Sequence, residues 1–192
     1  GEHSPYFLRT GVVQQLLYAQ AQLHSQYPGW KIQIFDAFRP IAVQQFMVDH
    51  AFAELAQAEG VSVETMSEEV RSRLQSEVIK FWAVPSADPN TPPPHSTGAA
   101  IDVTLTDTAG ETVDMGSPID EISPRSYPQH FAESSEPAAQ KAHQNRSLLA
   151  EIMTGAGFRQ HPNEWWHFSM GDQLWAWQMG EGAIARYGKA AI

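Results

Sequence analysis

The sequence predicts an α+β fold with a small, mostly antiparallel sheet flanked by helices. Segments with helical periodicity dominate the chain, and the few strand-like segments do not alternate with them as a parallel sheet requires. With 192 residues, 42% of them hydrophobic, the chain can also bury one sizeable core. We find no internal repeat and no linker composition, so residues 1–192 are expected to form a single domain.

Three helices and a strand are expected in the first half of the chain. Pro28 ends the first helix, and Pro40 stands where a first-turn proline belongs, directly before the second. Thr65 and Glu68 have the spacing of a capping box and predict the start of the third. The expected elements are helices over 10–26, 41–58 and 65–82, and a half-buried strand over 30–34.

The second half is expected to supply most of the sheet. Five prolines from Pro85 to Pro94 make a stiff loop that cannot be a helix or a central strand. Asp107 to Gly110 reads as a turn between two strands, and 116–136 is irregular. The expected elements are strands over 99–105, 111–115, around 158 and over 164–170, and a helix over 137–154.

Charge and composition exclude several classes of partner. The formal net charge is -10 and no Lys/Arg cluster interrupts it, so we expect no nucleic-acid or anionic-membrane partner. No apolar run is long enough to span a bilayer. The chain has no cysteine, which excludes disulfides and thiolate-rich zinc sites. The expected partner is a small substrate, and a homodimer is left open.

The first residues, Gly1-Glu2-His3, include no Met and no signal pattern, so a trimmed or processed start is expected. A cytoplasmic location is the expectation, with a periplasmic or secreted one left open for the same reason.

Four residues in two short segments offer the three donors and the general base of a catalytic zinc site. His95, Asp102 and His167 supply two imidazoles and a carboxylate, which would leave a fourth position for water. Glu164, three residues before His167, is a spare carboxylate that can act as the general base. This set indicates one Zn²⁺ per chain and a hydrolytic reaction.

The spacing of the donors demands a turn. Asp102 belongs to the polar side of the predicted strand, and His95, seven residues upstream, would face the other way in a continuous strand. Gly98 permits the turn or bulge that brings His95 round. Spacing alone leaves open that these histidines are ordinary surface or capped residues.

A family resemblance adds to this reading. His95-x-x-Gly98-x-Ala100-x-Asp102, followed by Glu164-Trp-Trp-His167, resembles D-alanyl-D-alanine dipeptidases of the VanX type. These belong to the zinc D,D-peptidases that share their fold with the Hedgehog signalling domain. Supporting segments fall in the same order: Asp36-Ala-Phe-Arg39-Pro40, Ile101-Asp102-Val-Thr-Leu105, Met115-Gly116-Ser117-Pro-Ile-Asp120 and Met153-x-x-x-Gly157-Phe158.

The resemblance implies a role for each matching residue. His95, Asp102 and His167 would be the zinc ligands, and Glu164 would be the catalytic base. Arg39 would stabilise the oxyanion, and Asp120 would receive the ammonium of the dipeptide. The reaction implied is hydrolysis of D-Ala-D-Ala to two D-alanines.

For the carboxylate end of the dipeptide, the resemblance supplies no clear partner. Pro93 stands where the family usually has a serine that helps to hold substrate. Backbone amides or hydroxyls near Ser96 and Thr97 are the expected donors to the substrate carboxylate.

Two rival functions remain at this point. One is a D,D-carboxypeptidase that trims longer cell-wall peptides; a carboxylate for the free ammonium, Asp120, argues for the dipeptidase instead. The other is a zinc-holding binding domain without catalysis, which would need neither Glu164 nor Arg39.

Overall fold

The computed structural model describes residues 5–191, so the expected processed start at Gly1-Glu2-His3 lies outside the described part. Its helices are α1 (Thr10–Gln26), α2 (Ile41–Ala58), α3 (Glu68–Val78), α4 (Pro137–Gly155) and α5 (Gln173–Met179), with short 3-10 turns η1 (Pro94–Thr97) and η2 (Pro124–Ser126). Its strands are β1 (Lys31–Asp36), β2 (Ala100–Thr106), β3 (Arg159–Gln160) and β4 (His167–Ser169). All strand pairings are antiparallel, in the order β1-β2-β4-β3, which confirms the predicted fold class.

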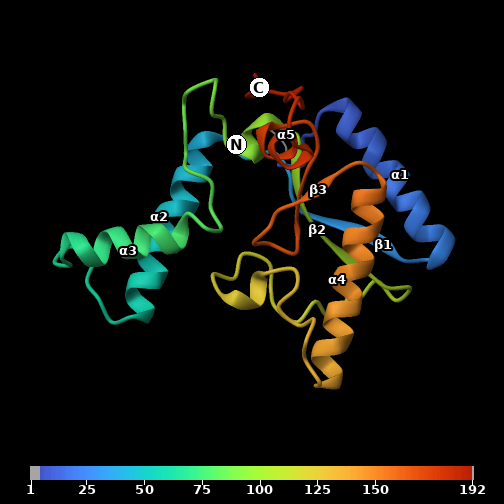
Figure 1. Cartoon of the computed structure of the whole chain (residues 1–192), viewed down its shortest axis with the longest axis horizontal. Coiled ribbons are helices and arrows are strands. Elements are labelled where there is room, and N and C mark those ends of the chain that lie inside the picture. The colour runs from blue at the N-terminus through green and yellow to red at the C-terminus, as the bar shows by residue number, and fades with distance from the viewer. Residues whose placement is uncertain (1–4, 192) are drawn as a thin grey trace.

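Strand β2 is the centre of the sheet, and all of its residues are buried. Its apolar side chains, such as Ile101 and Val103, belong to the main core, together with buried residues of α1 and α4. Figure 1 shows α1 and α4 side by side next to β1 and β2. Because side chains alternate along a strand, Asp102 and Thr104 lie on the opposite face, where the functional site is built.

Helices α2 and α3 form a separate unit that packs around a smaller apolar cluster. Its buried members are Ala51, Val78 and Trp82. In Figure 1 the two helices lie together, on the side of the molecule away from α1 and α4. Among residues 5–191 no helix has the length and hydropathy that a membrane span requires.

Four sequence predictions are wrong in detail. The strand predicted over 164–170 is limited to β4, His167–Ser169. The predicted strand 111–115 is reduced to one isolated bridge, Thr106 to Thr112. The physical reason lies in α4: Asn145 and Arg146 donate from their side chains to the carbonyls of residues 114 and 115, which a neighbouring strand would otherwise engage.

The other two errors concern helix starts. Helix α3 begins at Ser67, whose hydroxyl accepts from the Val70 amide, instead of at a Thr65 capping box, and it ends at Val78. Helix α5 was not predicted at all. It begins at Asp172, whose carboxylate accepts from the Trp175 amide.

Candidate metal centre and active site

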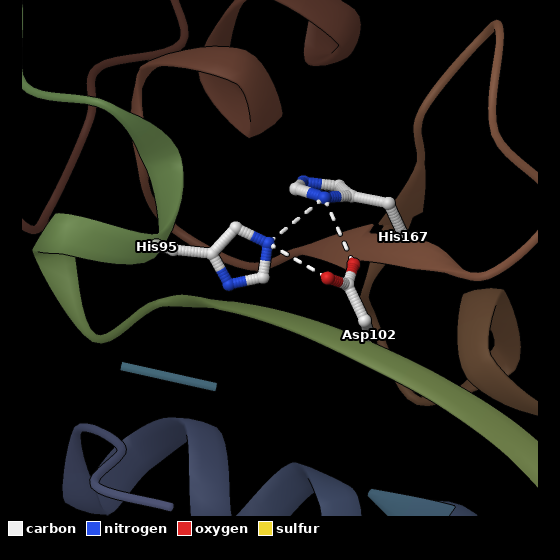
Figure 2. Close-up of side chains that lie close together, drawn as sticks. All are labelled: His95, Asp102 and His167. Carbon is white, nitrogen blue, oxygen red and sulfur yellow. Dashed lines mark hydrogen bonds and ion pairs between the residues drawn. The ribbon is translucent and has the colours of Figure 1, made fainter. Parts of the chain in front are cut away.

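Three side chains from distant parts of the chain converge on one point (Figure 2). Asp102 on β2 is the register partner of His167 on β4, so strand pairing alone brings these two together. His95 lies in η1, which ends at Gly98 with a φ of +70°, and this left-handed residue turns the chain into β2. The turn predicted from the spacing of His95 and Asp102 is therefore confirmed.

The donor atoms of these side chains are spaced as zinc requires. His95 Nε2 lies 3.2 Å from His167 Nδ1 and 3.3 Å from Asp102 Oδ2, and His167 Nδ1 lies 3.2 Å from Asp102 Oδ1. Tetrahedral bonds of roughly 2.0–2.1 Å to zinc would separate the ligand atoms by about 3.3 Å. Asp102 Oδ1 is buried and has no hydrogen-bond partner among the described residues, as expected of an oxygen kept for a metal. The three residues therefore fit a zinc ion.

Hydrogen bonds behind the two imidazoles set which nitrogen faces the centre. His95 Nδ1 donates to the Ala37 carbonyl at 2.7 Å, which leaves Nε2 free as a ligand atom. In His167 the arrangement is reversed: Nδ1 faces the centre, and Nε2 lies 3.3 Å from the Ser169 hydroxyl.

Burial and charge shift the two carboxylates in opposite directions. Burial alone would raise the pKa of Asp102, but His95 and His167 beside it hold that pKa well below its usual range. Burial raises the pKa of Glu164 well above its usual range, and the negative charges of Asp102 and Asp120 add to this. A carboxyl with a raised pKa is suited to accept a proton and then release it.

Glu164 and Arg39 border the metal centre without belonging to the donor triangle. Glu164 is 4% exposed, and its Oε2 lies 3.5 Å from His167 Nδ1. The Arg39 guanidinium is buried, donates to Asp36 Oδ2 from Nε at 2.9 Å and to Gln44 Oε1 from Nη1 at 2.9 Å, and approaches Asp102 Oδ2 to 3.4 Å. Arg39 is thus a cation held rigidly beside the site.

Asp120 also reaches the site. It lines the same small cavity as Glu164 and Arg39, and its backbone φ of +66° makes it the one non-glycine residue with positive φ in the described chain. Burial, followed by the charge of Asp102, raises the pKa of Asp120 to about 7. The carboxylate predicted to receive an ammonium therefore stands in the cavity wall.

Ser96 and Thr97 do not reach the site as donors. The Ser96 hydroxyl donates to the Arg39 carbonyl at 2.8 Å, and the Thr97 hydroxyl donates to the Pro94 carbonyl and accepts from the Ala99 amide. Neither residue lines the cavity. Their hydroxyls stabilise the η1 turn, because a sharp turn leaves backbone groups that need partners. The structure therefore does not support the expectation that these hydroxyls bind the substrate carboxylate.

Two residues that line the cavity, His161 and Trp82, were not predicted from the sequence. His161 Nδ1 accepts from the Asn163 amide at 3.2 Å and lies 3.8 Å from Glu164 Oε1. Burial, with His167 beside it, lowers the pKa of His161 to about 3. Its position three residues before Glu164 was the signal in the sequence.

Trp82, from the α2–α3 unit, is the second of these residues. It is 7% exposed, and its ring stacks under the Arg39 guanidinium at 5.2 Å. Its Nε1 is buried and has no hydrogen-bond partner among the described residues. Nothing in the sequence pattern pointed to it. Of the two adjacent tryptophans before His167, Trp166 lines the cavity and Trp165 lines a different pocket.

Comparison with known proteins gives a consistent result. The peptidase family described as D-ala-D-ala dipeptidase matches residues 2–183. A D-alanyl-D-alanine dipeptidase of Synechocystis sp. is 48% identical over 97% of this chain and 80% of its own length. One of Enterococcus faecalis is 32% identical over 80% of this chain and 69% of its own.

Two solved structures share the fold. A mutant of the vancomycin resistance D,D-pentapeptidase VanY with Zn(II) aligns with a TM-score of 0.53 at 17% identity, covering 85% of this chain and 72% of its own. VanYB in complex with D-alanine-D-alanine aligns with a TM-score of 0.52 at 15% identity, covering 85% and 71%. The predicted D,D-peptidase-like fold is confirmed.

Proposed function

The chain belongs to the D-Ala-D-Ala dipeptidase family of metallopeptidases, and from this we propose that it hydrolyses the dipeptide D-Ala-D-Ala with one zinc ion held by His95, Asp102 and His167. The observation that carries the proposal is the donor triangle with Glu164 and Asp120 beside it in one cavity. The names of the relatives and the zinc in the VanY structure support it.

When bound, zinc supplies a Lewis acid that polarises the scissile carbonyl and acidifies water. Glu164 takes the proton of the attacking water and passes it to the leaving amine. Its buried position beside His167 and its raised pKa suit both transfers. The residue therefore works as base first and acid second.

Arg39 meets the negative charge that develops on the carbonyl oxygen. Its guanidinium is held by Asp36 and Gln44 before substrate arrives, so no reorganisation is needed during the reaction. Charge stabilisation of this kind acts strongly in a buried site, because the surrounding dielectric is low.

The two charged ends of a dipeptide need separate partners. Asp120 faces the ammonium. For the carboxylate, the described residues offer Trp82, whose buried indole N–H in the cavity wall has no protein acceptor. Pro93 caps η1 and does not line the cavity, so the serine usual in the family has no equivalent there.

The alternative is a D,D-carboxypeptidase acting on longer cell-wall peptides. The cavity at the donor triangle contains a carboxylate, Asp120, suited to a free ammonium. This feature favours the dipeptide.

The deciding experiment compares substrates with the zinc-loaded protein. D-Ala-D-Ala should be cleaved well, and L-Ala-L-Ala, N-acetyl-D-Ala-D-Ala and a D-Ala-D-Ala-terminated pentapeptide poorly. Efficient cleavage of the acetylated dipeptide and the pentapeptide would establish the carboxypeptidase instead. If the zinc-loaded protein hydrolysed none of these compounds, the result would favour a zinc-holding binding domain without catalysis.

A further inference from the structure

The η1 turn, which carries one of the three metal donors, is held from outside by residues near both ends of the described chain. The Ser96 carbonyl accepts from the Ala190 amide at 2.9 Å. The Thr97 carbonyl accepts from Arg9 Nε at 2.8 Å, and the Gly98 carbonyl accepts from the Arg9 amide at 2.8 Å. Ser96 and Thr97 are buried, so these carbonyls need protein partners in place of water.

The turn needs this support because it is short. η1 is a 3-10 turn of four residues, a geometry that makes poorer hydrogen bonds than an α-helix does. Its own backbone bonds run from the Ser96 amide to the Pro93 carbonyl at 3.0 Å and from the Gly98 amide to the His95 carbonyl at 3.2 Å. Glycine loses more conformational freedom on folding than any other residue. External partners therefore supply much of the rigidity that a metal ligand on this turn requires.

Arg9 uses its guanidinium as a set of directed donors. Besides the bond to Thr97, its Nη2 donates to the Gly188 carbonyl at 3.0 Å, and its guanidinium carbon lies 5.5 Å from the centre of the Tyr187 ring. Within residues 5–191 its side chain pairs with these carbonyls and with no carboxylate. Because a guanidinium presents its donors in a fixed planar arrangement, Arg9 sets how η1 lies against the chain around Gly188.

The C-terminal segment, residues 186–190, connects η1 to the strand that carries His167. The amides of Arg186 and Tyr187 donate to the Gly171 carbonyl at 2.6 and 2.9 Å, just after the end of β4. The Tyr187 ring packs closely on Gly171, where an added Cβ would lie 3.0 Å from the ring. The segment contacts the end of β4 with its first residues and η1 with its last. It therefore joins the two elements that carry the imidazole donors.

We propose that Arg9 is a positioning residue for the zinc ligand His95, and that it acts with the C-terminal segment by fixing the backbone of η1. With the carbonyls of this turn held, the His95 imidazole keeps its place beside Asp102 and His167 (Figure 2). Arg9 does not line the cavity, so its effect on the metal centre passes through the turn. This inference rests on the proposed zinc site.

Arg9→Ala tests the role of the side chain. It removes the bonds to Thr97 and Gly188 and keeps the backbone amide that donates to Gly98. We expect the affinity for zinc, measured by competition with a chromophoric chelator, to fall about 10-fold or more. In protein loaded with Co²⁺ in place of zinc, the visible absorption bands should also shift, because they report the arrangement of the ligands.

Arg71→Ala is the matched control. Arg71 is also half-buried, donates to a backbone carbonyl, that of Val63, at 2.7 Å, and lies over an aromatic ring, that of Phe52, at 5.8 Å. It belongs to α3 and does not line the cavity. Its loss should lower Tm and leave both the zinc affinity and the Co²⁺ bands unchanged.

Ala190→Pro tests the same support without changing Arg9. Proline has no N–H, so the bond to the Ser96 carbonyl is lost while the bonds of Arg9 remain. Zinc affinity should fall here too, by a smaller factor than in Arg9→Ala because one bond is removed instead of two. Ala190→Gly, which keeps the N–H, should bind zinc as the parent does.

The amides of Arg39 and Gly98 report on the turn without metal, because both donate to the His95 carbonyl, at 3.3 and 3.2 Å. In metal-free protein, NMR should show faster exchange of these amides with deuterium in Arg9→Ala and the parental rate in Arg71→Ala.

Two results would separate this inference from the proposed function. Parental zinc affinity and unchanged Co²⁺ bands in both Arg9→Ala and Ala190→Pro would overturn the positioning role, even if Tm fell. If the parent bound no metal while the two amides still exchanged faster in Arg9→Ala, the zinc site would fail and the role of Arg9 in fixing η1 would stand.

Discussion

His95 Nε2 lies 3.2 Å from His167 Nδ1, although 72 positions in the sequence separate them. Two local features produce this contact: the pairing of Asp102 with His167 across β2 and β4, and the left-handed turn at Gly98. The positions of the three donors are therefore set by the pairing of β2 with β4 and by the turn at Gly98.

Each of the three donors should be needed for zinc. His95→Ala, Asp102→Ala and His167→Ala each leave two donors where a catalytic zinc site uses three. We expect each purified variant to lose its metal by elemental analysis, whereas His130→Ala, which changes an exposed histidine, should keep it. Full occupancy in two of the three triangle variants would contradict the assignment.

Glu164→Gln should separate metal binding from catalysis. The amide keeps the size of the side chain but cannot accept the proton of water, and loss of a general base commonly lowers kcat 10²–10⁴-fold. Zinc content should stay at the level of the parent. A variant that turned over at nearly the parental rate would remove Glu164 from the mechanism.

Asp120→Asn should weaken substrate binding by removing the carboxylate that faces the ammonium. Loss of one partner of a buried charge pair costs about 2–5 kcal/mol, so KM should rise about 30-fold or more. Because the pKa of Asp120 is raised to about 7, the parental KM should also rise as the pH falls from 8 to 6, and the variant should lack this dependence. Equal KM values for parent and variant would exclude the role.

The same pKa predicts the pH dependence of apo stability. The pKa of Asp120 is higher in the folded protein than its ordinary value of 3.8, so between about pH 4 and 7 the folded chain binds more protons. The contribution of Asp120 to the free energy of unfolding therefore falls as the pH rises through this window. Urea unfolding of metal-free Asp120→Asn should show a gain over the parent at pH 8 and little at pH 4, with Asp49→Asn, an exposed change on α2, as control.

Trp82→Phe tests the donor to the substrate carboxylate. Phenylalanine keeps an aromatic ring under Arg39 but has no N–H, and a hydrogen bond to a charged group is worth about 1.5–3 kcal/mol, or roughly 10- to 100-fold. KM should rise by that factor with zinc content unchanged, while Trp177→Phe, at an exposed position, should have no effect. An unaltered KM would mean that another group binds the carboxylate.

Much of the fold and of the site followed from local patterns. Helices α1 and α2 have the predicted bounds, because their periodicity is long and prolines mark their ends. For His95 and Asp102, residue type suggested a metal site, spacing alone left it open, and the family resemblance singled them out; the structure brings them together with His167.

The features that sequence reasoning missed depend on tertiary contacts. Strand 111–115 was lost to side chains of α4, such as Arg146, which no local pattern reports. The places of Trp82 and His161 in the cavity depend on how the α2–α3 unit and the Glu164 loop pack against the sheet. The engagement of the Ser96 hydroxyl inside its own turn is likewise a matter of geometry, not of spacing.

The site lies between the two hydrophobic clusters of the protein, and residues from both sides line its cavity. His167 lies on β4 beside Phe168, which belongs to the main core, whereas Trp82 belongs to the small α2–α3 cluster. Cooperative units of this kind open with different free energies. Trp82 and Gln44, the partner of Arg39, both come from this second unit, so its packing against the sheet sets one wall of the cavity. The amides of α2 and α3 should accordingly exchange with deuterium earlier than those of β2.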